Sequence, residues 1–186
     1  MEAFLYVRTR AGAALSVLGS LLGHHGVRRA ILVIGQWDVL ALIEGADMAS
    51  IAKTVLTGVH QLEGVVQTMT APIVPPGAMG ELGLGFGTAG PPTLLKGDAS
   101  LVHVKAAPGT VPELLERLAE MDEVTGIAAI AGPYDLLVEI RRPWDVASRT
   151  ILEKIHPLPG VHSTETMMAL DAEEFDEDRD QFSAWE

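Results

Sequence analysis

Two tetrapeptides each combine a glycine, an aromatic ring and a carboxylate, and they are the residues best suited to chemistry in this sequence. The first reads Gly35-Gln36-Trp37-Asp38 and the second Gly132-Pro133-Tyr134-Asp135. A carboxylate can accept a charge-assisted hydrogen bond from an ammonium group, and an aromatic ring can wall a small pocket. Asp beside a turn also commonly accepts hydrogen bonds from nearby backbone N–H groups, so a purely structural role is the alternative.

Each tetrapeptide lies between two short apolar runs. Residues 31–34 and 39–43 flank the first, and residues 127–130 and 136–140 flank the second. Glycine between two runs of strand type is typical of a hairpin corner, because glycine adopts backbone conformations that other residues avoid. The aromatic residue and the Asp are not needed for a turn, so the repeated pattern indicates one module used twice.

The surrounding residues predict the same element order in both copies. The first copy is expected to contain strands at 4–8, 27–34, 38–44 and 65–74 and helices at 13–22 and 47–62. The second is expected to contain strands at 101–105, 124–131, 134–141 and 161–170. It is also expected to contain two helices, one that begins at a capping box over Thr110–Glu113 and one over 145–156. The order is βαββαβ. We therefore predict an α+β chain of two ferredoxin-like modules, residues 1–74 and 99–170.

The segments outside these modules have different compositions. Residues 75–98 are rich in Gly and Pro and nearly uncharged, which is typical of a linker. The glycines at 83, 85 and 87 are followed by no helix, so a phosphate-binding loop is not expected. Residues 171–186 hold eight carboxylates and one Arg. They are expected to form a solvated acidic tail, or to dock their aromatic residues on a sheet or a neighbouring subunit.

The bulk composition excludes several classes of protein. The net charge of −12 disfavours direct binding to nucleic acid, because an acidic surface repels phosphates. The chain has no cysteine, which excludes disulfides and thiolate sites. It has no apolar run long enough to span a membrane, and we expect no signal peptide, because the first residues lack the basic and apolar stretches of one. We expect a cytoplasmic protein that does not associate with a membrane.

The six histidines form no recognisable metal cluster. His60 and His156 occupy equivalent positions near helix ends, where an imidazolium is stabilised by the helix dipole. His103, on a core strand opposite Tyr6 of the first copy, is the one residue that we would nominate for acid–base catalysis. The alternative is a core histidine whose ring is hydrogen-bonded and has only a structural role. We expect no metal and no cofactor.

Taken together, the motifs resemble the effector-binding domain of the Lrp/AsnC family of bacterial and archaeal regulators. The resemblance rests on Gly-x-aromatic-Asp at the hairpin and on a later Leu-x-Gly-Val-x-x-Thr-x-Thr pattern. That pattern begins at Leu62 in the first copy and at Leu158 in the second. The helix-turn-helix usual in this family is missing, so a role in transcription regulation would need a DNA-binding partner protein.

The resemblance implies a dimeric α/β barrel in which two βαββαβ units pair their sheets. It also implies assembly into homo-oligomers and the binding of small effectors, typically amino acids, between units. The ligand-binding residues carried over from the family are Gly35, Trp37, Asp38, Thr68, Thr70, Gly132, Tyr134, Asp135, Thr164 and Thr166. Hydroxyl groups such as those of Thr70 and Thr166 could donate to the carboxylate of an amino acid.

We therefore expect a non-enzymatic regulatory protein that binds a small effector, an amino acid, without a cofactor, and that acts through ligand-dependent assembly. Two alternatives stay open. One is an enzyme on the same barrel, of the haem- or siroheme-associated kind. The other is a structural oligomerisation module with no ligand.

Overall fold

The computed structural model describes residues 1–75, 89–95 and 97–170 of the chain. The first module is built from six elements in the order βαββαβ. They are β1 (Glu2–Thr9), α1 (Ala14–Leu22), β2 (Val27–Ile34), β3 (Val39–Glu44), α2 (Met48–Lys53) and β4 (Val65–Pro72). Helix α2 continues through a π-helical turn (Thr54–Gly58) and a 3-10 turn (Val59–Gln61), so the polypeptide is helical up to Gln61.

The second module repeats this order and confirms the predicted α+β class. Its elements are β5 (Ala99–Ala106), α4 (Val111–Ala119), β6 (Gly126–Ala129), β7 (Leu136–Ile140), α5 (Trp144–Arg149) and β8 (Val161–Leu170). Helix α5 also continues as a π-helical turn (Thr150–Ile155). Among the described residues, no helix is both long and apolar enough to cross a membrane.

Helix starts differ between the two modules. Asp47 caps α2, since its carboxylate accepts a hydrogen bond of 2.7 Å from the backbone N–H of Ser50. The capping box predicted at Thr110 does not form. Thr110 has helical backbone angles rather than extended ones, and its hydroxyl donates to the carbonyl of Ala107 at 2.8 Å. This hydroxyl therefore stabilises the loop before α4 instead of the helix.

The eight strands form one continuous sheet in the order β4-β1-β3-β2-β8-β5-β7-β6. The modules join at one seam through β2 and β8, where Leu32 pairs with Leu170. A second seam joins the outer strands, since Ile73 at the end of β4 bridges Ile130 beyond β6. With both seams made, the sheet closes into a barrel within a single chain.

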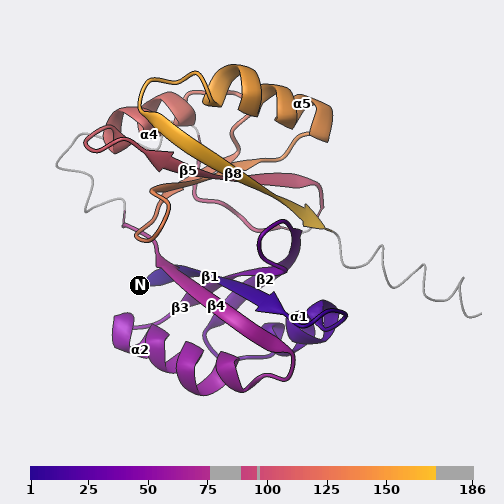
Figure 1. Ribbon diagram of the computed structural model, residues 1–186. Helices are drawn as coiled ribbons and strands as arrows, with labels where there is room; N and C mark the ends of the chain where they lie inside the picture. The colour runs from indigo at the N-terminus through magenta and orange to yellow at the C-terminus, as the bar shows by residue number, and fades with distance from the viewer. Residues whose placement is uncertain (76–88, 96, 171–186) are drawn as a thin grey trace, which may run out of the picture.

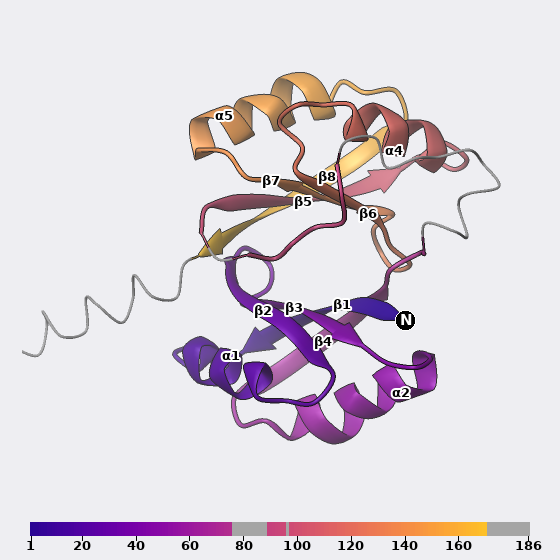
Figure 2. The same ribbon diagram turned by 180° about the vertical axis from the view of Figure 1, so that it is seen from behind.

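The barrel has four layers, with the helices outside and the two halves of the sheet facing each other (Figures 1 and 2). Side chains alternate between the two faces of each strand. On β1, Phe4 and Tyr6 point into the barrel, while Leu5 and Val7 point to the helices. The barrel interior is therefore a core contributed by both modules.

The part of the inter-module segment that precedes β5 lies against the second module. We call residues 89–95 the strap. Gly90 forms a parallel bridge with Gly126, and a Cβ atom at Gly126 would lie 2.7 Å from Pro92 Cα. Only glycine at position 126 allows this approach. Part of the segment predicted to be a linker is therefore docked along the edge of β6.

Candidate ligand site

The hairpin glycines of the two modules lie at the seams. A Cβ atom on Gly35 would lie 3.0 Å from Cγ of Met167, in the last strand of the second module. A Cβ atom on Gly132 would lie 3.8 Å from Cβ of Ala71, in the last strand of the first module. Each corner thus packs against the other module, and the approach is closer at Gly35.

The two predicted aspartates bind neighbouring backbone. Oδ2 of Asp38 accepts hydrogen bonds from the backbone N–H of Thr9 at 2.7 Å and from its hydroxyl at 3.2 Å. Oδ2 of Asp135 accepts from the N–H of Ala106 at 2.8 Å and lies 3.2 Å from Nζ of Lys105. Both carboxylates hold the hairpin corner to the end of the adjacent strand, as in the structural alternative considered from the sequence.

The predicted aromatic residues point into the barrel and meet there. The rings of Trp37 and Tyr6 are 5.8 Å apart, those of Tyr6 and His103 are 5.2 Å apart, and His103 stacks on Tyr134 at 4.4 Å. The Tyr6 hydroxyl lies 2.8 Å from Nε2 of His103. These four rings cross from the first module to the second.

Glu165 completes the polar part of this interior. It pairs with His103 across β5 and β8, so both side chains lie on the interior face. The Tyr134 hydroxyl donates to Oε2 of Glu165 at 2.5 Å. Arg8, above the Trp37 ring, donates to the carbonyl of Gln36. We call Tyr6, Trp37, His103, Tyr134 and Glu165 the interior cluster.

Burial changes the acid–base behaviour of these groups. It lowers the pKa of His103 to about 4, because an imidazolium would lose its hydration. Burial, followed by the hydrogen bond to Glu165, raises the pKa of Tyr134 to about 12. The pKa of Tyr6 is also raised, chiefly by burial. At neutral pH the cluster therefore contains a neutral imidazole and two protonated phenols.

The predicted threonines lie on the opposite face of the sheet. Thr68 and Thr70 pair with Val7 and Leu5, whose side chains face the helices. In the second module, the threonines likewise pair with helix-facing valines of β5. The sheet therefore separates the threonines from Trp37 and Tyr134, and the ten predicted residues do not line one pocket.

Each module instead brings a threonine to a histidine at the end of its second helix. His60 Nε2 lies 2.7 Å from the Thr68 hydroxyl, and His156 Nε2 lies 2.6 Å from the Thr164 hydroxyl. Both pairs line open pockets, of about 320 Å³ and about 300 Å³. The second of these outer pockets is lined by Trp144, Ser148, Ile151, Leu152, His156, Thr164 and Thr166.

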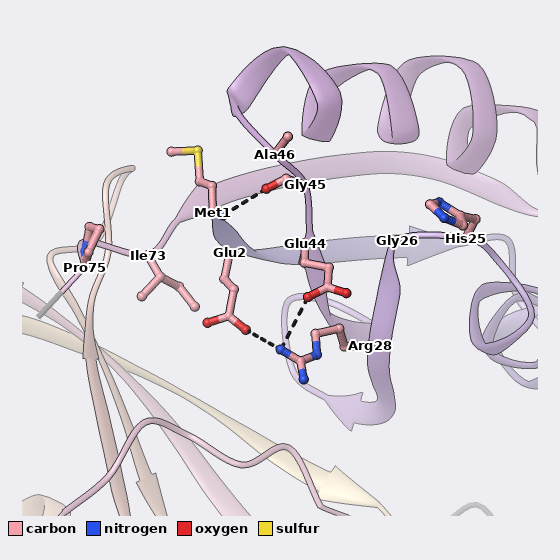
Figure 3. A pocket seen from close by; sticks show the side chains of 10 residues that line it. All are labelled: Met1, Glu2, His25, Gly26, Arg28, Glu44, Gly45, Ala46, Ile73 and Pro75. Atoms are coloured by element: carbon pink, nitrogen blue, oxygen red, sulfur yellow. Dashed lines mark hydrogen bonds and ion pairs between the residues drawn. The ribbon is translucent and has the colours of Figure 1, made fainter.

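A larger groove of about 910 Å³ lies at the start of the first module (Figure 3). It contains none of the predicted residues. Arg28 bridges its two carboxylates, at 3.1 Å from Glu2 and 3.3 Å from Glu44. In the second module, the residue equivalent to Glu44 is Arg141, which donates to the carbonyl of Leu95 in the strap. The strap thus reaches the position that corresponds to this groove.

The sequence singled out Trp37, Tyr134 and His103, which lie in the interior cluster, but not Glu165, which lies there as well. The available signal was a difference between the copies, because the residue equivalent to Glu165 in the first module is Met69. A carboxylate replacing a core methionine indicates a change of role. Within the described residues, no group of three or more His, Cys, Asp or Glu side chains could hold a metal ion.

Comparisons with known proteins agree with this architecture. Residues 100–178 match the family model described as the Lrp/AsnC ligand binding domain. The fold resembles that of the siroheme decarboxylase NirDL, with a TM-score of 0.62 at 7% identity over 91% of this chain and 71% of that chain. A second structure of NirDL, in complex with an iron-uroporphyrin III analogue, gives a TM-score of 0.60 at 8% identity, over 100% of this chain and 80% of that one. At such low identity, the likeness shows the fold alone.

Sequence relatives are transcription regulators. The chain is 33% identical over 107 residues to the HTH-type transcriptional regulator FL11 of Pyrococcus horikoshii. The aligned region covers 58% of this chain and 60% of the relative. The corresponding protein of Pyrococcus abyssi is 32% identical over the same shares. The chain thus spans about 60% of the length of these relatives.

The fold is a tandem arrangement in which two ferredoxin-like modules close one barrel. The chain carries a Lrp/AsnC ligand-binding domain in its second module, and the first module repeats the same fold.

Proposed function

We propose that this protein binds an amino acid as its effector and responds by changing its assembly. The observation that carries the proposal is the pair of outer pockets at equivalent positions, each with a histidine–threonine pair. Hydroxyl and imidazole N–H groups are suitable donors for the carboxylate of an amino acid. In the second module, Thr166 adds a second hydroxyl and Trp144 adds an aromatic wall.

Exposed apolar side chains on the second helix of each module support the assembly step. Leu56 in the first module and Leu152 in the second occupy equivalent positions and are 57% and 61% exposed. Met48 and Trp144, also equivalent, are 40% and 50% exposed. Clustered apolar residues on an outer helix are typical of an interface between protein chains. A ligand in the second outer pocket, which Trp144 and Leu152 line, would contact such an interface and stabilise it.

The test is a thermal-shift panel of the twenty amino acids at about 10 mM, followed by light scattering with and without the best ligand. A ligand at 100 times its Kd adds about 2.7 kcal/mol, which corresponds to roughly 5–10 °C for a chain of this size. We expect a selective shift and a change in mass. Thr166→Val should reduce the shift. Leu56→Ser, at an exposed residue that lines neither outer pocket, should reduce the mass change while ligand binding persists.

The outcome also distinguishes the alternatives. No shift with any amino acid, together with a constant oligomer mass, would favour a structural oligomerisation module. A role in transcription requires a partner protein that supplies DNA binding, and co-purification with such a partner in the presence of the effector is the corresponding test.

A second candidate function is an enzyme that uses the barrel interior. The observation that favours it is His103, which is fully buried, neutral at physiological pH and hydrogen-bonded to Tyr6. Such a histidine could exchange a proton with a bound substrate. The absorption spectrum of the purified protein tests the tetrapyrrole-associated form of this candidate, since a bound tetrapyrrole absorbs strongly in the visible range.

A further inference from the structure

Three buried side-chain atoms in the described part of the chain have no hydrogen-bond partner, and all three belong to the interior cluster. They are Nε1 of Trp37, Nδ1 of His103 and Oε1 of Glu165. Trp37 is 4% exposed and His103 is fully buried. Buried polar atoms nearly always have a partner, so three such atoms in one cluster need an explanation.

The chemistry of the three atoms is complementary. The indole Nε1–H of Trp37 is a donor only, and the carboxylate oxygen of Glu165 is an acceptor only. The Nδ1 atom of His103 is a donor or an acceptor, depending on which ring nitrogen carries the proton. A single molecule that bound all three atoms would have to offer both a donor, for Glu165, and an oxygen acceptor, for Trp37.

The protein's own cations near the cluster are directed elsewhere. Arg8 donates to the Gln36 carbonyl, and Lys105 pairs with Asp135. His103 is uncharged at neutral pH because its pKa is lowered to about 4. The Tyr134 phenol donates a hydrogen bond to Glu165 but brings no charge. The buried carboxylate oxygen is thus left without a cation.

The aromatic rings around the Glu165 carboxylate would suit a positively charged group. Ammonium groups are attracted to the faces of aromatic rings. The rings of Trp37, Tyr6 and Tyr134 are linked through His103 by successive ring contacts. The cluster reaches the surface beside exposed Gln36, where Tyr134 and Glu165 are half-buried. A small molecule would therefore enter the cluster from this side.

We propose that the interior cluster is a second binding site, for one small molecule per chain that carries a primary ammonium group and an oxygen acceptor. Glu165 binds the ammonium group, and Trp37 donates to the oxygen. The first module has Met69 at the position of Glu165, so the site is single although the barrel is built from two copies. This site is separate from the outer pockets and does not depend on them.

The test uses amides of glycine, alanine, leucine and phenylalanine, which carry an ammonium group and a carbonyl oxygen. The N-acetyl derivatives of the same amides lack the charge and are the matched controls. Binding to the full chain is followed by calorimetry and by the fluorescence of its tryptophans. We expect at least one amide to bind with a stoichiometry of one per chain, and its N-acetyl derivative to bind at least tenfold more weakly.

Variants assign the site. Glu165→Met copies the residue of the first module, so it should fold and lose binding, and Glu165→Gln should bind at least tenfold more weakly. Thr166→Val, in the outer pocket, should bind the amide normally. Binding that survives Glu165→Met, that is lost in Thr166→Val, or that is absent for every amide would overturn the proposal. In the last case, ordered water alone completes the three hydrogen bonds.

Discussion

The hydroxyl of Tyr6 and the Nε2 atom of His103 lie 2.8 Å apart, and these residues occupy equivalent positions, 97 residues apart, in the two modules. Their hydrogen bond crosses the barrel interior near the axis that relates the copies. A duplicated module would place identical residues here. The chain instead pairs a phenol with an imidazole, which provides a donor and an acceptor in a fully buried position.

Removing one member of this pair should destabilise the barrel. Tyr6→Phe leaves Nε2 of His103 buried without a partner, and we expect a loss of about 1–3 kcal/mol in the free energy of unfolding. Urea denaturation measures this loss. The double variant Tyr6→Phe/His103→Phe removes both polar groups and should be more stable than the sum of the single losses predicts. Strict additivity would contradict a direct interaction.

Burial of neutral His103 should make the stability pH-dependent. Its pKa is lowered from 6.5 to about 4 in the folded protein, so between these values the unfolded chain binds more protons. The free energy of unfolding should therefore fall as the pH is lowered through this window, by roughly 3 kcal/mol. Denaturation at several pH values should show this slope in the parent and its loss in His103→Phe. The exposed His25→Gln variant should keep it.

The two hairpin glycines should respond differently to alanine. At Gly35 a Cβ atom would approach Met167 Cγ to 3.0 Å, and the φ angle of 153° is unfavourable for other residues. Gly35→Ala should cost about 1–2 kcal/mol. At Gly132 the nearest atom is at 3.8 Å, so Gly132→Ala should be close to neutral. Thermal denaturation of the two variants compares them directly, and equal losses would contradict the seam geometry.

The strap should depend on Glu139. This carboxylate is fully buried in β7 and accepts hydrogen bonds from the N–H of Thr93 at 2.7 Å and of Leu94 at 3.2 Å. Glu139→Leu copies the equivalent Leu42 of the first module and leaves both N–H groups without a partner. We expect a loss of about 2–4 kcal/mol and faster cleavage of the strap by proteases.

A matched control for this effect is Glu153→Gln, because Glu153 is exposed on the second helix of the same module. It should change neither stability nor cleavage. If Glu139→Leu left cleavage of the strap at the parent rate, the carboxylate would not be what holds it.

Sequence reasoning recovered the fold because its signals are local. The hairpin glycines, the alternation of apolar residues and the Asp47 cap each depend on neighbours a few positions away. The repetition of the same order in two copies made the module clear. The Thr110 capping box failed, because the backbone angle at that position is set by the loop from Ala107.

The sequence by itself determined two βαββαβ modules, their hairpin corners and the aromatic residues placed there. Only the tertiary structure decided that the modules close a barrel within one chain, and that Trp37 and Thr68 lie on opposite faces of the sheet. It also decided that Glu165 joins His103 and Tyr134 in the interior. The reason is physical: strand register and the packing of two sheets bring together residues nearly a hundred positions apart, and no local pattern records which of them meet.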